Sequence, residues 1–345
     1  NDLCNLIKDF QFLWKGKTLQ LSTSAGLAEI DANSGSLTDL LSAADAACCV
    51  AKEQGRNRVH WFESGDAAVK RRHGQLLWVQ RVKQSLDNDR FTLYKEEFVP
   101  LSKAANNAVH YEILLRMIDE NGNVVSPMSF IPAAERYNLM PAVDRWVINK
   151  TLKTLANRDG IENSNSIYAV NLSGQSLNDD GFLKYTIDQF DESGISPGRI
   201  CFEITETTAI ANLTRASRLM SILKGMGCHF ALDDFGSGLS SFSYLKNLPV
   251  DYLKIDGSFV QNILSNRIDY AMVDSINQIG QLMGLQTIAE CVEDNETLKK
   301  VKALGIDFAQ GHGIAKVVPL KFQQDTEHNN HNKVIHTLSK IRTRA

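Results

Sequence analysis

Polar residues that are costly to bury stand at or near the ends of seven consecutive segments with the pattern of short strands. A single polar residue at a strand end can simply begin a loop. A run on seven consecutive strands is hard to obtain by accident, so the whole set is a candidate functional site. Its members are Glu112, Asn171, Glu203, Asp233 with Asp234, Lys254, Glu290 and Gln310.

The side-chain types in this set favour a hard divalent cation. Carboxylate and amide oxygens suit Mg²⁺ or Mn²⁺, whereas zinc would usually recruit His or Cys, and the set has neither. The adjacent Asp233 and Asp234 point in different directions at a strand end, so the pair can serve two ions. Two ions about 3.5–4 Å apart can activate a bridging water and stabilise both in-line oxygens of a phosphoryl displacement. Lys254 would then polarise that water or neutralise phosphate, and a salt bridge inside the fold is its structural alternative.

The elements that would position this set alternate between strand and helix along residues 87–322. Such alternation requires crossover connections and therefore a parallel sheet. Eight strands over about 230 residues fit a (β/α)₈ TIM-like barrel, in which the strand carboxyl ends converge on one catalytic mouth. A doubly wound open sheet is the alternative, although no GxGxxG motif opens a helix. The predicted strands are Phe91–Phe98, Tyr111–Leu115, Tyr168–Leu172, Cys201–Ile204, His229–Leu232, Tyr252–Ile255, Gln286–Ala289 and Asp307–Ala309, and the main helices are Pro141–Leu155, Leu213–Met226 and Ile268–Met283.

Composition and charge narrow the class of protein. The 345 residues are 43% hydrophobic and 22% charged, which is typical of a globular chain and excludes collagen-like and disordered classes. The net charge of −3 gives no global basic field to hold long nucleic acid, so a nucleotide would need a local site. No run of eighteen apolar residues occurs, and the first residue is Asn1. We therefore expect a cytoplasmic piece of a longer protein, with an upstream sensor or membrane anchor left open.

Three further features have both a functional and a structural interpretation, and we favour the structural one in each. The six cysteines form no CxxC pair and fit a reduced interior better than disulfides or zinc. The basic cluster Arg71–His73, in a predicted linker helix over residues 66–86, fits a solvated face better than a phosphate site. The three histidines of the polar tail, residues 323–345, fit a solvated tail better than a metal site.

Motifs along most of the chain point to one family. The segment DDFGSGLSS contains the DFG of protein kinases, but no HRD loop or Gly-rich lid accompanies it. Residues 86–322 instead resemble the EAL-domain phosphodiesterases, which hydrolyse the bacterial second messenger cyclic di-GMP to linear pGpG. The resemblance implies a barrel whose first strand runs antiparallel to the others. The matching motifs are YEILLR (Tyr111–Arg116), FIPAAE (Phe130–Glu135), NLS (Asn171–Ser173), FEITET (Phe202–Thr207), DDFGSGLSS (Asp233–Ser241), LKIDGSF (Leu253–Phe259), AECVE (Ala289–Glu293) and QG (Gln310–Gly311).

The resemblance also implies a role for each matching position. Two ions, Mg²⁺ or Mn²⁺, would share Asp233, Ca²⁺ would inhibit, and the chain would form a homodimer through this domain. Lys254 would orient the nucleophilic water and act in catalysis with Glu112 and Glu290. The positions that match metal ligands are Glu112, Asn171, Glu203, Asp233, Asp234 and Glu290. Those that match substrate contacts are Arg116, Gln310 and Pro132, while Glu206 would pin the DDFGSGLSS loop and Glu293 would support the site.

Four positions depart from the family pattern without removing a ligand or the lysine. Ile113 replaces the Ala of the EAL signature, and Glu96 stands where the family often has Gln before the end of the first strand. Cys291 replaces a usual Gly, and His312 stands where an aromatic residue is common. We expect Ile113 to shift packing beside the first ligand and Glu96 to alter substrate affinity.

The first 65 residues resemble the C-terminal half of a GGDEF diguanylate cyclase domain, through SAGLAEI (Ser24–Ile30) and ADAACCVAKEQGRNRV (Ala44–Val59). No GGDEF motif occurs in the chain, so this part cannot carry cyclase activity. Its pattern predicts strand Thr18–Ile30, helix Leu37–Lys52 and strand Arg58–Phe62, too little to enclose much core.

For the whole chain, an active phosphodiesterase is our first hypothesis. A catalytically silent cyclic di-GMP receptor is the alternative, and a scaffold that binds no nucleotide is the third.

Overall fold

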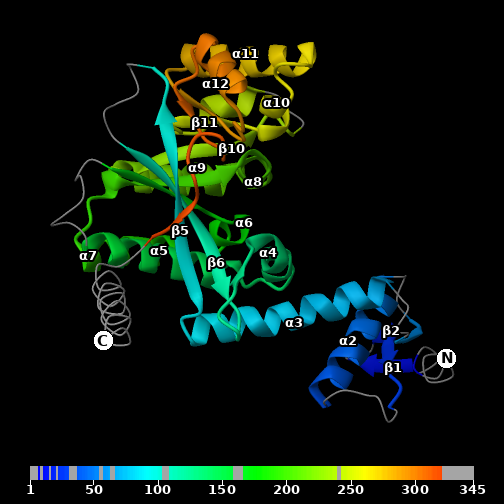
Figure 1. Ribbon diagram of the computed structural model, residues 1–345. Helices are drawn as coiled ribbons and strands as arrows, with labels where there is room; N and C mark the ends of the chain where they lie inside the picture. Colours follow the sequence, from blue (N-terminus) through cyan, green and yellow to red (C-terminus); the bar gives the residue numbers. More distant parts are fainter. Residues whose placement is uncertain are drawn as a thin grey trace, which may run out of the picture. The chain divides into compact units, whose positions relative to one another are not determined.

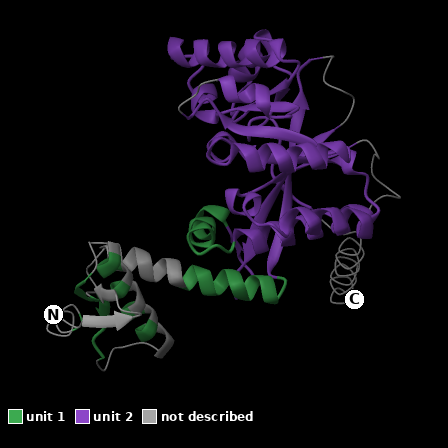
Figure 2. Ribbon diagram, turned by 180° about the vertical axis from the view of Figure 1, so that it is seen from behind, with its two compact units in different colours: residues 1–89, 126–139 green, residues 90–125, 140–345 purple. Residues whose placement is uncertain are grey.

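The computed structural model divides the chain into two compact units (Figures 1 and 2). Unit 1 comprises residues 1–89 and 126–139, and unit 2 comprises residues 90–125 and 140–345. The predicted polar tail and the side chains of Arg71–His73 lie outside the described residues. The structure describes residues 7, 11–14, 17–20, 22–30, 37–53, 57–62, 67–102, 109–157, 166–238 and 242–320.

Unit 1 is a small α/β arrangement followed by a long helix. β1 pairs with β2 in an antiparallel hairpin, β3 pairs with β4 in parallel, and α2 packs on β3 and β4. Helix α3 packs against α2 and α4. The elements are β1 (Gln11–Trp14), β2 (Lys17–Gln20), β3 (Ala25–Leu27), α2 (Leu37–Glu53), β4 (Val59–Trp61), α3 (Ala67–Asp87) and α4 (Pro127–Arg136).

The prediction of one strand over Thr18–Ile30 is wrong, because the structure divides this segment into β2 and β3, which have different partners. Helix α2 lies directly on β3 at Gly26. A Cβ added to Gly26 would stand 1.9 Å from the carbonyl oxygen of Ala44. Gly26 therefore permits the close approach of the helix to the strand rather than a bend within one strand.

Unit 2 is a closed barrel of eight strands (Figure 1). β5 pairs with β6 on one side and with β13 on the other, which closes the ring β5-β13-β12-β11-β10-β9-β8-β6. β5 is antiparallel to both neighbours, whereas the other neighbouring strands of the ring are parallel, so both the barrel and its antiparallel first strand are confirmed. The strands are β5 (Phe91–Pro100), β6 (His110–Ile118), β8 (Ile167–Asn171), β9 (Ile200–Thr205), β10 (His229–Phe235), β11 (Tyr252–Ile255), β12 (Gln286–Ala289) and β13 (Phe308–Ala309), with β7 (Val124–Val125) and β14 (Val318–Pro319) added at β6 and β5.

Amphipathic helices connect the parallel strands. On α11, Val273 and Ile276 are fully buried while Gln278 and Gln281 are exposed, so one face of the helix covers the sheet. The three main predicted helices are confirmed to within one residue at each end, as α5, α9 and α11. No helix in the described part of the chain has the length and hydropathy needed to cross a membrane. The helices are α5 (Met140–Ala156), α6 (Gly174–Leu177), α7 (Phe182–Ser193), α8 (Glu206–Ala211), α9 (Leu213–Gly225), α10 (Gly257–Gln261), α11 (Arg267–Leu282) and α12 (Asn295–Ala303), with 3₁₀ turns at Pro197–Arg199 and Phe242–Asn247.

One end of the barrel interior is filled by a layer of mostly apolar side chains, which we call the floor. The His110 ring packs into it, with its centroid 4.7 Å from that of Phe308 and 5.6 Å from that of Tyr252. Burial, together with the charge of nearby His229, lowers the pKa of His110 to about 4, so His110 is neutral at pH 7. The floor residues are Phe98, Ala169, Cys201, Ala231, Tyr252, Ile288 and Phe308, with His110 among them.

Candidate active site

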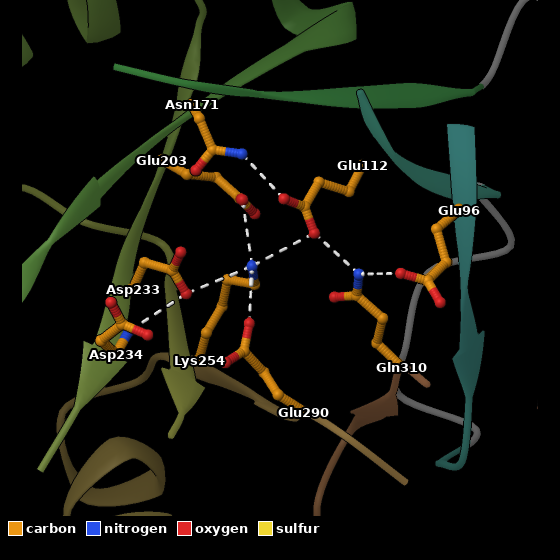
Figure 3. A network of polar contacts seen from close by, with 9 residues as sticks. All are labelled: Glu96, Glu112, Asn171, Glu203, Asp233, Asp234, Lys254, Glu290 and Gln310. Atoms are coloured by element: carbon orange, nitrogen blue, oxygen red, sulfur yellow. Dashed lines mark hydrogen bonds and ion pairs between the residues drawn. The ribbon is translucent and has the colours of Figure 1, made fainter. Parts of the chain in front are cut away.

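The next layer of the barrel interior is polar. Residues two positions apart on a strand point to the same face, so the side chain that follows each floor residue by two also points inward. On antiparallel β5 the count runs backward, from Phe98 to Glu96. We call the resulting set the polar layer: Glu96, Glu112, Asn171, Glu203, Asp233, Lys254, Glu290 and Gln310 (Figure 3).

Lys254, at the third position of β11, is the centre of the polar layer and is 1% exposed. Its ammonium nitrogen lies 2.8 Å from Glu290 Oε1, 3.0 Å from Glu203 Oε2, 3.2 Å from Asp233 Oδ1 and 3.5 Å from Glu112 Oε2. Burial alone would lower the pKa of Lys254, but the surrounding carboxylates outweigh it and raise that pKa well above its usual value. The cluster therefore favours the charged form of Lys254, which donates hydrogen bonds.

Two side-chain amides hold the carboxylate of Glu112. Asn171 Nδ2 donates to Glu112 Oε1 at 2.7 Å, and Gln310 Nε2 donates to Glu112 Oε2 at 2.7 Å. The same Gln310 nitrogen donates to Glu96 Oε2 at 2.8 Å (Figure 3). The arrangement fixes both oxygens of Glu112 at the end of the barrel where the strands β8 and β9 finish.

Asp233 and Asp234 reach the same centre because β10 is irregular there. The pairing of β10 with β11 shifts between Leu232 and Phe235, and Asp234 has a left-handed φ of 52°. One carboxylate oxygen each of Asp233, Asp234 and Glu290 lie within 4.8 Å of one another, close enough to share an ion. A non-glycine residue in this conformation is strained, and such strain is common at functional sites.

The polar layer with Asp234 carries an excess of negative charge. Burial first, and then the neighbouring carboxylates, raise the pKa of Glu290 to about 8 and also raise the pKa values of Glu203 and Asp234. Buried Glu203 Oε1 has no hydrogen-bond partner among the described residues. An oxygen-rich cluster with a shortage of positive charge and an unpaired buried acceptor fits a divalent cation such as Mg²⁺ or Mn²⁺.

Glu206, at the start of α8, is fully buried and accepts hydrogen bonds from two residues of the segment that follows Asp234. The backbone N–H of Gly236 donates to Glu206 Oε2 at 2.9 Å, and the Tyr244 hydroxyl donates to Glu206 Oε1. Gly236 has a φ of 99°, which glycine adopts without strain. These contacts flank residues 239–241 of the DDFGSGLSS motif, which lie outside the described residues.

The remaining predicted site residues lie farther from Lys254 or in the other unit. Arg116 follows Glu112 by four positions on β6, with its guanidinium carbon 5.5 Å from the Tyr94 ring centroid and Nη1 donating to the Leu115 carbonyl at 2.8 Å. Pro132 lies inside α4, which belongs to unit 1. Glu293 is exposed. Their predicted roles stay predictions.

Two of the sequence departures have a geometric explanation. Cys291 has a left-handed φ of 52°, the conformation that glycine adopts most easily, which accounts for the usual Gly at this position. Ile113 is 3% exposed and points away from the polar layer, because its neighbour Glu112 points inward.

Glu96 is the member of the polar layer that the strand-end rule missed. Its strand runs antiparallel, so its inward polar residue precedes the floor residue Phe98 instead of following it. The signal was in the sequence, since Lys95-Glu96-Glu97 interrupts an apolar strand. Counting backward along the first strand would have found it.

The fold and the site together define a class: an eight-stranded α/β barrel with a carboxylate and lysine cluster at one end of its interior. Residues 79–317 match the sequence model of the EAL domain. The chain belongs to the EAL-domain family.

Curated relatives and solved structures agree with this family. The chain is 39% identical over 282 residues to "Cyclic di-GMP phosphodiesterase PdeB" of Shewanella oneidensis, a match that covers 82% of this chain and 33% of that protein. It is 36% identical over 246 residues to "Cyclic di-GMP phosphodiesterase PdeF" of Escherichia coli, covering 71% of this chain and 32% of that protein. The chain thus spans about a third of the length of these relatives.

Two solved structures resemble the barrel closely. The first, "PaMucR Phosphodiesterase, c-di-GMP complex", has a TM-score of 0.66 and 27% identity, and covers 70% of this chain and 98% of that chain. The second, the FimX EAL domain of Pseudomonas aeruginosa bound to c-di-GMP, has a TM-score of 0.65 and 28% identity, and covers 71% of this chain and 98% of that chain.

Proposed function

We propose that this chain is a metal-dependent phosphodiesterase that hydrolyses cyclic di-GMP to linear pGpG. The observation that carries the proposal is the polar layer, in which Lys254 meets four carboxylates in a barrel of the EAL family. The names of the relatives from Shewanella and Escherichia support the substrate and the reaction. The structures of two EAL domains with c-di-GMP support binding of the same nucleotide.

The donor set fits two divalent cations, Mg²⁺ or Mn²⁺. Asp233 would be shared between them, Asp234 and Glu290 would complete one site, and the other would draw on the group Glu112, Asn171 and Glu203. When bound, such ions lower the pKa of a water molecule and neutralise charge on the phosphate. Calcium prefers more ligands and looser geometry, so we propose that Ca²⁺ binds and inhibits.

The side chains of the barrel have complementary tasks in this reaction. Lys254 in its charged form would donate a hydrogen bond to the attacking water or to the phosphate. Arg116 would bind a substrate phosphate through its guanidinium. Glu206 would keep the DDFGSGLSS segment in place beside Asp234, through its bonds to Gly236 and Tyr244.

Chromatography of cyclic di-GMP incubated with the chain and Mn²⁺ tests the proposal. The comparison is between the wild type, Lys254→Ala and the matched control Lys302→Ala, which removes an exposed lysine of α12. A pGpG peak is expected from the wild type and Lys302→Ala, and it should form about 10²–10³-fold more slowly with Lys254→Ala. Nucleotide binding without product in the wild type would make the chain a receptor, and neither binding nor product would make it a scaffold.

We further propose that residues 1–65 are the C-terminal part of a GGDEF-like domain, joined by a linker helix over residues 66–86 to a catalytic domain over residues 87–322. The relative MucR of Pseudomonas aeruginosa, named a bifunctional diguanylate cyclase/cyclic di-GMP phosphodiesterase, supports this, because its match covers 304 residues and 87% of this chain. We propose that the whole chain lies in the cytoplasm, where the free thiols Cys201 and Cys228 would stay reduced.

A homodimer through the barrel domain completes the proposal. Exposed apolar residues on and next to α11, among them Leu264, Ile268 and Leu282, support an interface on that side. Light scattering of the chain over a range of concentrations is expected to give twice the mass of 38.4 kDa. A mass of one chain at all concentrations would remove the dimer and leave the proposed reaction untouched.

A further inference from the structure

Glu96 lies directly opposite Glu112 across the antiparallel pair β5 and β6. Both carboxylates are buried, each with 7% of the residue exposed. Like charges at directly opposed positions of two strands repel each other, and burial strengthens the repulsion. A carboxylate at position 96 therefore needs a partner that serves both residues.

Gln310 is that partner. Its amide nitrogen donates one hydrogen bond to Glu96 Oε2 at 2.8 Å and one to Glu112 Oε2 at 2.7 Å. An amide nitrogen carries two protons, so these two bonds use its full donor capacity. The bridge links the two carboxylates through one fixed side chain.

The two carboxylates also determine which way the amide faces. An ionised carboxylate only accepts hydrogen bonds, so the Gln310 nitrogen must face Glu96 and Glu112 and its oxygen must face elsewhere. Figure 3 shows that oxygen turned to the side on which Lys254 and Glu290 lie. Buried Gln310 Oε1 has no hydrogen-bond partner among the described residues. It is an acceptor aimed into the site.

We propose that Glu96 is a positioning residue of this site: through the Gln310 amide it holds Glu112 in the orientation that binds a divalent cation and keeps an acceptor oxygen facing Lys254. A glutamine at position 96, which the family often has, would still offer an oxygen to the Gln310 nitrogen, whereas a leucine would leave one of the two amide protons without an acceptor. The inference rests on the proposed function for the metal site and for its effect on turnover.

The consequence for metal binding follows from how Glu112 is held. Asn171 fixes one of its oxygens and Gln310 the other. Without an acceptor at position 96, Gln310 is held by Glu112 alone, so Glu112 has a firmly fixed partner only at Asn171. Changes in residues that orient a metal ligand typically reduce metal affinity about 10-fold or more.

Calorimetric titration of Mn²⁺ into the full chain without nucleotide tests the inference on three variants. Glu96→Leu nearly keeps the size of the side chain and removes the acceptor, and Glu96→Asp keeps the charge but shortens the reach to Gln310. Glu97→Gln is the matched control, because it removes the same charge from the neighbouring residue on the opposite face of β5. Thermal unfolding of each metal-free variant checks that it folds.

The expected result is a dissociation constant for Mn²⁺ that rises about 10-fold in both Glu96 variants and stays within twofold of wild type in Glu97→Gln. At saturating Mn²⁺, kcat for cyclic di-GMP would fall in the Glu96 variants with KM little changed. A dissociation constant for Mn²⁺ in Glu96→Asp equal to that of wild type would show that charge alone matters, and it would overturn the inference. Equal constants in all variants, or no Mn²⁺ binding by wild type, would overturn it as well. If the wild-type chain binds Mn²⁺ without hydrolysing cyclic di-GMP, the proposed function is refuted. The ratio of the Mn²⁺ dissociation constants of the Glu96 variants to that of wild type would still decide this inference.

Discussion

The floor and the polar layer of the barrel lie two residues apart on the same strands, yet their side chains differ in kind. In the floor, Phe308 and Ile288 are at most 1% exposed and contact other apolar or aromatic groups. In the polar layer, Lys254 and Glu203 are equally buried and contact opposite or like charges. Burying each large apolar side chain stabilises the fold by about 1.5–3 kcal/mol, whereas burying a charge costs free energy unless it is paired.

The comparison shows that the layer in which an inward-facing side chain lies decides its role in this barrel. One step along the inward face changes the task from stabilising the fold to holding charge. The floor then offsets the cost of the polar layer above it. Substitutions in the two layers should therefore affect different measurements.

The largest effect is expected from Lys254→Ala. The change removes the only ammonium that the described structure places in the polar layer, and it leaves four carboxylates without their cation. Loss of one preorganised donor of this kind lowers kcat by about 10²–10³-fold. Turnover of cyclic di-GMP at saturating Mn²⁺ measures it, and activity within twofold of Lys302→Ala would contradict the assignment.

A floor variant should instead lower stability. Phe308→Ala removes a fully buried ring from the floor and is expected to reduce the free energy of unfolding by about 3–5 kcal/mol, measured by urea denaturation. The control Val318→Ala, at a residue that is 43% exposed, should change it by about 0.5 kcal/mol or less. A loss below about 1 kcal/mol for Phe308→Ala would mean that the floor does not support the barrel.

The pH dependence of stability should reveal the charge excess of the polar layer. In the metal-free chain the pKa of Glu290 is raised from 4.5 to about 8, so between these values the folded state binds more protons than the unfolded state. Glu290 therefore lowers the free energy of unfolding as the pH rises, and this effect is unopposed by His110 between about pH 6.5 and pH 8. Thermal unfolding after chelator treatment measures the trend, and saturating Mn²⁺ should reduce it. Below about pH 6.5 neutral His110 has the opposite effect, because its pKa is lowered from 6.5 to about 4. A metal-free chain that gains stability from pH 6.5 to pH 8 would therefore contradict the charge assignment.

The smallest effect is expected from Tyr244→Phe, which touches neither layer. It removes the hydroxyl that donates to buried Glu206 and should lower the free energy of unfolding by about 1–2 kcal/mol. The dissociation constant for Mn²⁺ should not change, because Tyr244 makes no contact with the polar layer in the described structure. A large loss of metal affinity in this variant would mean that the Glu206 contacts reach the metal ligands.

Much of the barrel could be predicted from the sequence because its strands are short, apolar and regularly spaced. The positions of Asn171, Lys254 and the other predicted polar residues at strand ends also placed them at one mouth of the barrel. The antiparallel direction of β5 came from resemblance alone, since the side-chain period of a strand is the same in both directions.

Some features depend on contacts between distant residues and could not be predicted from local pattern. The Gln310 bridge joins residues separated by 214 and 198 positions. The break between β2 and β3 depends on the approach of α2 to Gly26. The left-handed backbone of Asp234 depends on a register shift between two strands. Only the folded arrangement supplies these constraints.

A single Mn²⁺ titration of the chelator-stripped chain tests the central claim that the polar layer is a metal-dependent phosphodiesterase centre. Bound Mn²⁺ is measured by calorimetry, and pGpG formation is measured at the same metal concentrations. The account predicts no turnover without metal, and turnover that rises with occupancy of the Mn²⁺ sites. Full turnover by the stripped chain, or full occupancy of the sites without pGpG, would contradict it.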